Sequence, residues 1–271
     1  MASTTPNGAG GFIPPPSASP ASSSSASTVT PSHLPRQRSH PLRAGSMKET
    51  TLINHVDKTI LAINRRHAKK FSSRYEAQDQ DQQSSERGYE NFKEVVRDIE
   101  PVVDLVWVSG TPSLQIPYLI SLSVLVNSFL PAYPFTPRAT FRLLRKLDCI
   151  FASLLTGQDA ETESPLPGFE NRRDLVSMTE KVRIKSIVES CRVAVVETRG
   201  QEGDGSTSDG SVGATEEEDE DDLTGSSDLD GFGEPVGRWE MEAARVYEKT
   251  IQLLGDELGK QGELEGGFSA C

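Results

Sequence analysis

The longest uncharged stretch of the chain leaves two kinds of fold open. Residues 105–137 read LVWVSGTPSLQIPYLISLSVLVNSFLPAYPFTP and carry no charged side chain. A helix of about 20 apolar residues can cross a lipid bilayer, so residues 112–130 could form a single membrane span. The same composition suits the central helix of a bundle, which is apolar on nearly all sides because other helices surround it.

Polar residues and turns inside this stretch favour the bundle. Seven residues between 112 and 130 are poor lipid-facing material: Ser113, Gln115, Pro117, Ser121, Ser123, Asn127 and Ser128. Both flanks are proline or glycine turns rather than further apolar chain, and the neighbouring segments are amphipathic with one apolar face each. We therefore expect a soluble core helix here and keep a single-pass membrane protein, spanning at 112–130, as an alternative.

Apolar residues recur every three or four positions along the rest of the chain, which is the period of a helix. This pattern predicts helices over residues 47–71, 89–106, 112–130, 137–156, 171–198 and 238–258. Ser46-x-x-Glu49 and Ser177-x-x-Glu180 have the form of capping boxes, Pro101 should kink or restart the second helix, and Gly157 should cap the fourth. No segment shows a strand pattern. The sequence predicts an all-α protein, a single helical bundle of about six helices.

Composition divides the chain into five parts. We expect a disordered Ser/Pro-rich arm at 1–45, a helical core at 46–198, a disordered acidic Gly/Ser linker at 199–237, an amphipathic helix packing on the bundle at 238–260, and a flexible tail at 261–271. The net charge is +3 over residues 1–45, +1 over 46–200 and −16 over 201–271, within a total of −12. The acidity therefore belongs to the C-terminal part.

No motif of a known catalytic chemistry is present. The nearest candidate for a phosphate-binding loop, GDELGKQG at 255–262, has the wrong spacing and no preceding strand. The acidic run EEEDEDD at 216–222 lacks the rigid frame that a positioned acid–base pair needs. Three cysteines and four scattered histidines form no pattern of metal ligands. We expect a protein that is not an enzyme and needs no metal or cofactor.

Two basic clusters are candidate interaction surfaces. Four cations share one face of the fourth predicted helix: Arg138, Arg142, Arg145 and Lys146. They could be a solvated face, or they could bind an anionic partner such as DNA or an acidic protein segment. The run RRHAKK contains Arg65, Arg66, Lys69 and Lys70 and resembles a nuclear import signal, although charge runs on helices are commonly just solvated.

The acidic linker offers two candidate phosphorylation sites. Thr215 and Ser227 each precede acidic residues, as acceptors of acid-directed kinases do. Phosphorylation would add further negative charge to this part of the chain.

Two segments carry a resemblance to a known family. DIEPVVDLVWVSGTPSLQIPYL (98–119) and PFTPRATFRLLRKLD (134–148) resemble a group of uncharacterised filamentous-fungal proteins, some labelled meiotic recombination proteins. The resemblance covers about the central hundred residues. A RecA-type ATPase is excluded, because the chain lacks a phosphate loop and the strands of a parallel sheet, so the resemblance implies an accessory role in recombination.

These observations favour a non-enzymatic adaptor or subunit of a larger assembly, in the nucleus or the cytoplasm, whose partners are other protein subunits. The alternative is an accessory factor of DNA recombination or repair that binds nucleic acid through a basic helix face.

Overall fold

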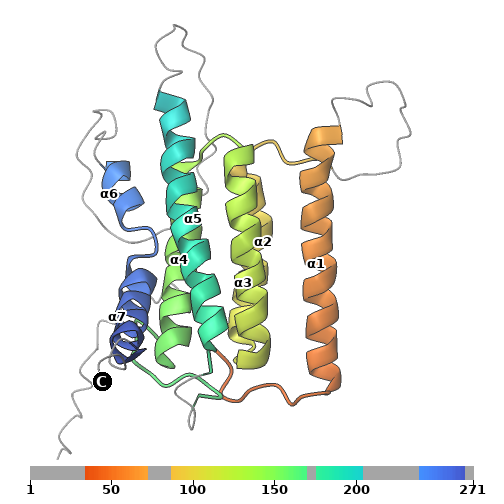
Figure 1. Ribbon diagram of the computed structural model, residues 1–271. Coiled ribbons are helices and arrows are strands. Elements are labelled where there is room, and N and C mark those ends of the chain that lie inside the picture. The colour runs from red at the N-terminus through yellow and green to blue at the C-terminus, as the bar shows by residue number, and fades with distance from the viewer. Residues whose placement is uncertain (1–33, 73–86, 170–174, 204–237, 266–271) are drawn as a thin grey trace, which may run out of the picture. The chain divides into compact units, whose positions relative to one another are not determined.

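The computed structural model describes residues 34–72, 87–169, 175–203 and 238–265 (Figure 1). Its helices are α1 (Met47–Ser72), α2 (Phe92–Val108), α3 (Pro112–Phe129), α4 (Pro137–Thr156), α5 (Met178–Gly203), α6 (Arg238–Ala244) and α7 (Glu248–Glu265), with a 3-10 turn at Leu130–Ala132. The described ranges contain no strand, only an isolated bridge between Gln158 and Pro165. The predicted all-α bundle is confirmed. Most of the predicted arm (1–33), most of the predicted acidic linker (204–237) and part of the predicted tail (266–271) lie outside these ranges.

Helix α3 lies at the centre of the packing. It contacts α2, α4 and α5, and Leu119, Leu122 and Val126 are completely buried. Its buried Gln115 is satisfied, because Nε2 donates to the carbonyl of Trp107 at 2.8 Å. Within the described residues, Pro112–Ala132 is one stretch long and apolar enough to cross a membrane, with mean hydropathy 1.4, and 56% of its window is buried inside the protein. That burial fits the core-helix interpretation.

Proline does not interrupt α2. Of the kink or restart predicted at Pro101, the restart does not occur, because the helix runs unbroken from Phe92 to Val108. Pro101 lies on the exposed side of the helix. The helix starts at Asn91, whose side chain accepts a hydrogen bond from the N–H of Glu94 at 2.9 Å.

Helix α5 starts later than predicted, at Met178 rather than Asn171, and continues to Gly203. The second capping box sets this start. The N–H and hydroxyl of Ser177 donate to the carboxylate of Glu180 at 2.7 and 2.6 Å, and the Ser177 hydroxyl accepts from the Glu180 N–H at 3.3 Å. Apolar residues before Ser177 belong to the approach to the helix, where Val176 is buried.

The predicted last helix is two helices, α6 and α7, which is a correction to the sequence-based boundary. Residues 245–247 separate them, and Tyr247 adopts φ 54°. The first turn of α7 is capped from α4: the carboxylate of Asp148 accepts from the N–H of Thr250 at 2.9 Å, from the Thr250 hydroxyl at 2.7 Å and from the N–H of Lys249 at 3.3 Å. The break places Tyr247 in the core and turns these donors towards Asp148.

Residues 34–45 form a strap along the junction of α2 and α3, ahead of the predicted start of order at Ser46. The indole N–H of Trp107 donates to the carbonyl of Pro35 at 3.0 Å. The N–H of Arg38 donates to the carbonyl of Val108 at 3.1 Å, and that of Leu42 to the Thr111 hydroxyl at 2.8 Å. Gly110 lies beneath the strap at φ 55°, where a Cβ would come within 3.2 Å of the Arg38 carbonyl. The strap thereby fixes one wall of the site described next.

Candidate protein-binding surface

Cations predicted to form a basic surface on α4 make ion pairs with acidic residues of the same protein. Arg142 pairs with Glu100 at 2.8 Å, and Lys146 pairs with Glu100 at 2.7 Å and with Asp104 at 3.0 Å. Arg145 pairs with Glu242 of α6 at 3.4 Å. The face therefore joins α4 to α2 and α6, which lowers its net positive charge. The side chains of Arg142 and Arg145 are nevertheless 62% and 53% exposed, and Arg138 lies on the same side of the helix, also exposed.

The RRHAKK segment lies in the last turns of α1 and holds that end of the helix on the protein. Arg66 pairs with Asp98 at 2.5 Å and with Glu94 at 3.4 Å, and its guanidinium lies 4.1 Å from the centre of the Tyr89 ring. Lys70 donates to the carbonyl of Ala132 and lies 3.9 Å from the centre of the Tyr133 ring.

The other two cations of this segment differ in exposure, Arg65 being exposed and Lys69 partly buried. Arg66 and Lys70 of the candidate import signal therefore take part in helix packing.

His67, between these cations, stacks on Phe129 with a ring separation of 3.8 Å. Its Nδ1 lies 2.7 Å from the Tyr133 hydroxyl, a contact that suits a neutral ring accepting a hydrogen bond from the phenol. Burial, and secondarily the charge of Lys70, lower the pKa of His67 below its usual 6.5. The end of α1 is thus attached through a neutral histidine.

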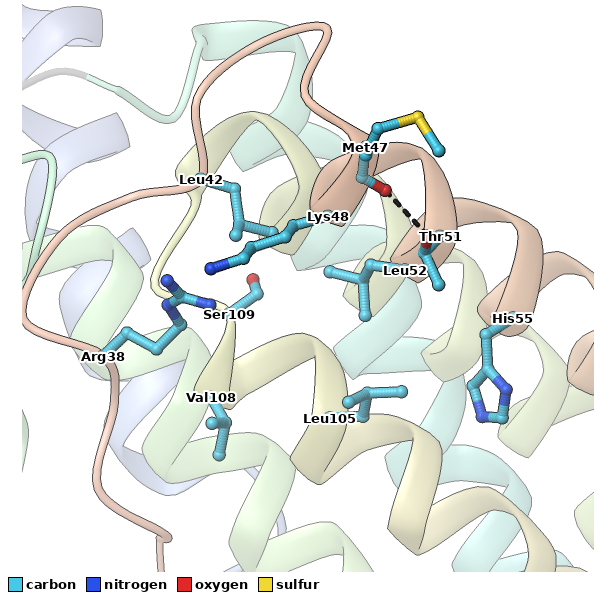
Figure 2. Close-up of a pocket in the computed structure, with 10 residues that line it drawn as sticks. All are labelled: Arg38, Leu42, Met47, Lys48, Thr51, Leu52, His55, Leu105, Val108 and Ser109. Carbon is cyan, nitrogen blue, oxygen red and sulfur yellow. Dashed lines mark hydrogen bonds between the residues drawn. The ribbon is translucent and has the colours of Figure 1, made fainter.

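The other half of α1 is separated from α2 by an apolar hollow of about 570 Å³ (Figure 2). Leu52 of α1 and Leu105 of α2 face each other across it, and Leu42 of the strap and Val108 close the far side. The side chains of Lys48 and Arg38 reach the same end of the hollow, above Ser109. The hollow therefore has an apolar floor and a basic end.

A second hollow, of about 530 Å³, continues between the same two helices. It is lined by Thr59, Ala62, Ile63 and Arg66 of α1 and by Arg97, Asp98 and Pro101 of α2, with Arg87 nearby. Because α1 and α2 are antiparallel neighbours, the two hollows lie in line along one interhelical crevice. We call this crevice, with both hollows, the α1–α2 groove.

The far side of α2 is also open. A third hollow of about 850 Å³ lies between α2 and α4 and shares Arg97, Pro101, Leu105 and Val108 with the other two. These residues, with Lys93, form an exposed or half-exposed line along α2 at spacings of three or four. α2 therefore buries one face in the core and presents the opposite face between hollows.

The cations of the groove differ from those of α4. Arg38, Lys48 and Arg97 of the groove, and Lys93 of the third hollow, form no ion pair with any residue in the described ranges, whereas Arg142, Arg145 and Lys146 do. Sequence reasoning selected α4 because its cations are consecutive along one face. It missed Lys93 and Arg97, although their spacing to Pro101 and Leu105 could have marked a basic and apolar line.

The described part of the chain offers little for catalysis. Within it no group of three or more His, Cys, Asp or Glu residues is placed to hold a metal ion. Cys149 and Cys191 are buried free thiols, and burial raises the pKa of Cys191 to about 12. Such thiols are weak nucleophiles at neutral pH. The candidate phosphorylation sites Thr215 and Ser227 lie outside the described residues.

One comparison with known proteins finds a match. The family model described as TFB6, subunit 11 of the general transcription factor TFIIH, matches residues 88–255, which is more than half of the chain and runs from the approach to α2 into α7. No curated protein and no solved structure matches. The comparisons therefore lend no support to the recombination label implied by the earlier resemblance.

Proposed function

The chain belongs to the TFB6 family, and we propose that it acts as a non-enzymatic helical subunit of a nuclear assembly of the TFIIH type. The family description supports the assembly. An adaptor rather than a catalyst is supported by the chain's lack of any recognised catalytic motif.

The observation that carries a binding role is the open face of α2. This helix lies within the residues matched by the family model, and its inner face contributes Phe92, Val96, Val103 and Trp107 to the core. Its outer face carries cations that form no ion pair within the described part of the chain, and half-buried apolar side chains between hollows. Interfaces combine an apolar centre with a polar rim, and this face has both.

Purification of the tagged full chain from nuclear extract, followed by mass spectrometry, tests the proposal. We expect subunits of one transcription-factor assembly to co-purify in constant proportion. A matched preparation of the Leu122→Asp variant, which removes the folded core, should lose them. Recovery of no TFIIH subunit with the folded chain would overturn the proposed function.

A second function, DNA binding through α4, is favoured by the exposure of Arg142 and Arg145. It predicts that the full chain binds a DNA duplex at low salt and that affinity falls steeply as salt rises. The double variant Arg142→Glu and Arg145→Glu should abolish this binding. Absent binding at low salt, or affinity unchanged in the variant, would reject it.

The import signal is a separate proposal that bears on nuclear location. Arg65→Ala with Lys69→Ala changes two cations of RRHAKK and keeps Arg66 and Lys70, which anchor α1. We expect the tagged variant to shift from nucleus to cytoplasm under the microscope. Lys58→Ala, an exposed cation elsewhere on α1, should not shift it, and an unchanged distribution of the double variant would refute the signal.

A further inference from the structure

We propose that the α1–α2 groove binds an acidic amphipathic helix of a partner protein, with apolar side chains of that helix on the groove floor and its carboxylates against Arg38, Lys48 and Arg97. The proposal rests on the proposed function as a subunit and names the chemistry of the partner segment.

The groove has the shape and lining that a helix requires. Two hollows in line follow the length of two antiparallel helices, and the first is floored by Leu42, Leu52, Leu105 and Val108. A helix that lies in such a groove inserts apolar residues at spacings of three, four and seven. Met47, 82% exposed at the mouth of the first hollow, is a further adaptable apolar contact.

Charge selects the class of partner. Arg38 and Lys48 lie at one end of the groove and Arg97 lines the other hollow, and none of the three has an acidic partner in the described ranges. Asp98, the acid that lines the groove, is occupied by Arg66 at 2.5 Å and by the Tyr89 hydroxyl at 2.7 Å. Uncompensated cations beside an apolar floor favour a partner that brings carboxylates, and they steer it into place.

The backbone adds one polar feature. Proline has no N–H, so residue 101 cannot donate to the carbonyl of Arg97 as the helical pattern requires. Both residues line the groove. That carbonyl therefore lacks its usual helical donor, at the point where the apolar hollow meets the polar one.

An acidic helix fits the groove better than DNA does. Nucleic acid binds through many phosphate contacts along a basic surface, whereas the first hollow is floored by leucine and valine with cations only at its end. The chain as a whole carries −12, so its net charge does not favour DNA. A short acidic and apolar segment matches both parts of the lining.

The test uses two synthetic 18-residue helical peptides with identical leucines at spacings of three and four. One carries glutamates at the remaining positions and the other carries lysines. Fluorescence anisotropy with the full chain should show binding of the glutamate peptide and no binding of the lysine peptide. The variant Lys48→Glu with Arg97→Glu, which changes one cation of each hollow, should weaken that binding at least tenfold.

A matched control changes the same number of charges elsewhere. Arg183→Glu with Lys185→Glu alters two cations of α5, which contributes no residue to the three hollows. It should change the affinity less than twofold. Both variants should keep the thermal midpoint of the parent, since all four side chains lie at the surface or half-buried.

Other outcomes would overturn the proposal. Equal binding of both peptides would mean that the cations do not select the partner. If a DNA duplex competes with the peptide for the parent and does not bind the variant Lys48→Glu with Arg97→Glu, the groove would be assigned to nucleic acid. Affinity raised tenfold by deleting residues 204–237 would assign it to the chain's own acidic segment, and self-association in sedimentation that the groove variant abolishes would assign it to a second copy.

Failure here is distinguishable from failure of the proposed function. If the groove variant still co-purifies TFIIH subunits in full yield, the groove is not the docking site and the subunit role stands. If even the unaltered chain co-purifies none, the subunit role itself fails.

Discussion

Helices α1 and α3 are adjacent in the protein but are held in opposite ways. α3 has 18 residues, ten of them buried, and it contacts three other helices. α1 has 26 residues, of which only Val56 and Ile63 are buried hydrophobic side chains, and its attachment relies on ion pairs and aromatic contacts near its C-terminal end. α1 also lies outside the matched residues 88–255. The comparison teaches that the region matched by the family model does not include α1, although α1 supplies one wall of the groove.

The largest expected loss of stability comes from placing an aspartate in α3, compared with the same change in α1. Leu122 of α3 is completely buried, so Leu122→Asp combines the loss of a core leucine with a buried unpaired carboxylate, costing about 5 kcal/mol or more, which is comparable to the whole stability of many domains. Leu61→Asp on α1, at a side chain 49% exposed, should cost less than about 1 kcal/mol. Circular dichroism and denaturant unfolding compare the two. Equal losses would break the contrast between the helices.

The next effect concerns a buried polar contact of the core. Asp148→Ala leaves the Thr250 N–H and hydroxyl and the Lys249 N–H without their acceptor, which should cost about 2–3 kcal/mol in unfolding free energy. Asp148→Asn keeps an acceptor oxygen and should recover part of the loss. Denaturant unfolding measures both. If Asp148→Ala were neutral, the α7 cap would not contribute to stability.

A smaller effect is expected from the half-exposed polar contacts of α1. Arg66→Met removes the pairs with Glu94 and Asp98 and keeps an apolar stem over Tyr89, at a cost of about 1 kcal/mol or less. Amide exchange should quicken in α1 and stay unchanged in α3 and α4. Arg65→Met, at an exposed neighbouring cation, is the control. Faster exchange throughout the bundle would show that α1 is coupled to the core after all.

The smallest effect is a pH dependence of the α1 attachment. The pKa of His67 in the folded protein is below 6.5, so the unfolded state binds the proton first as pH falls. Its stabilising contribution is complete above about pH 6.5 and is lost as pH drops through the folded pKa. Unfolding midpoints at pH 7.5 and 5.5 should differ less in His67→Gln than in the parent. His55→Gln, at an exposed histidine of α1, should leave the difference unchanged.

Local signals in the sequence predicted most of the helices. Ser177 and Glu180 form the expected capping box, and Gly157 adopts φ 72° as the expected C-cap of α4. The break at Tyr247 was missed because Val246 and Tyr247 also fit an uninterrupted helical stripe. Its cause, the carboxylate of Asp148, lies 102 residues from Thr250, and no pattern confined to one segment can reveal it.

The candidate groove was not predictable for a related reason. Hydrophobic periodicity marks the inner face of α2 but does not say how much of the outer face a neighbouring helix covers. Leu105 lies on that outer face and is half-buried where it lines the first hollow. Which cations have partners was equally hidden, since Glu100 and Asp104 meet Lys146 only after folding.

The Asp148 cap has a consequence for synthesis on the ribosome. Helix α4 is made long before Thr250, yet its buried carboxylate has its α7 donors only once the segment 102 residues later has emerged. Until then the site of α7 on α4 is an exposed apolar surface around a negative charge. The bundle cannot complete its packing during translation of its first helices, and a chaperone that covers apolar surface would find α4 accessible throughout that interval.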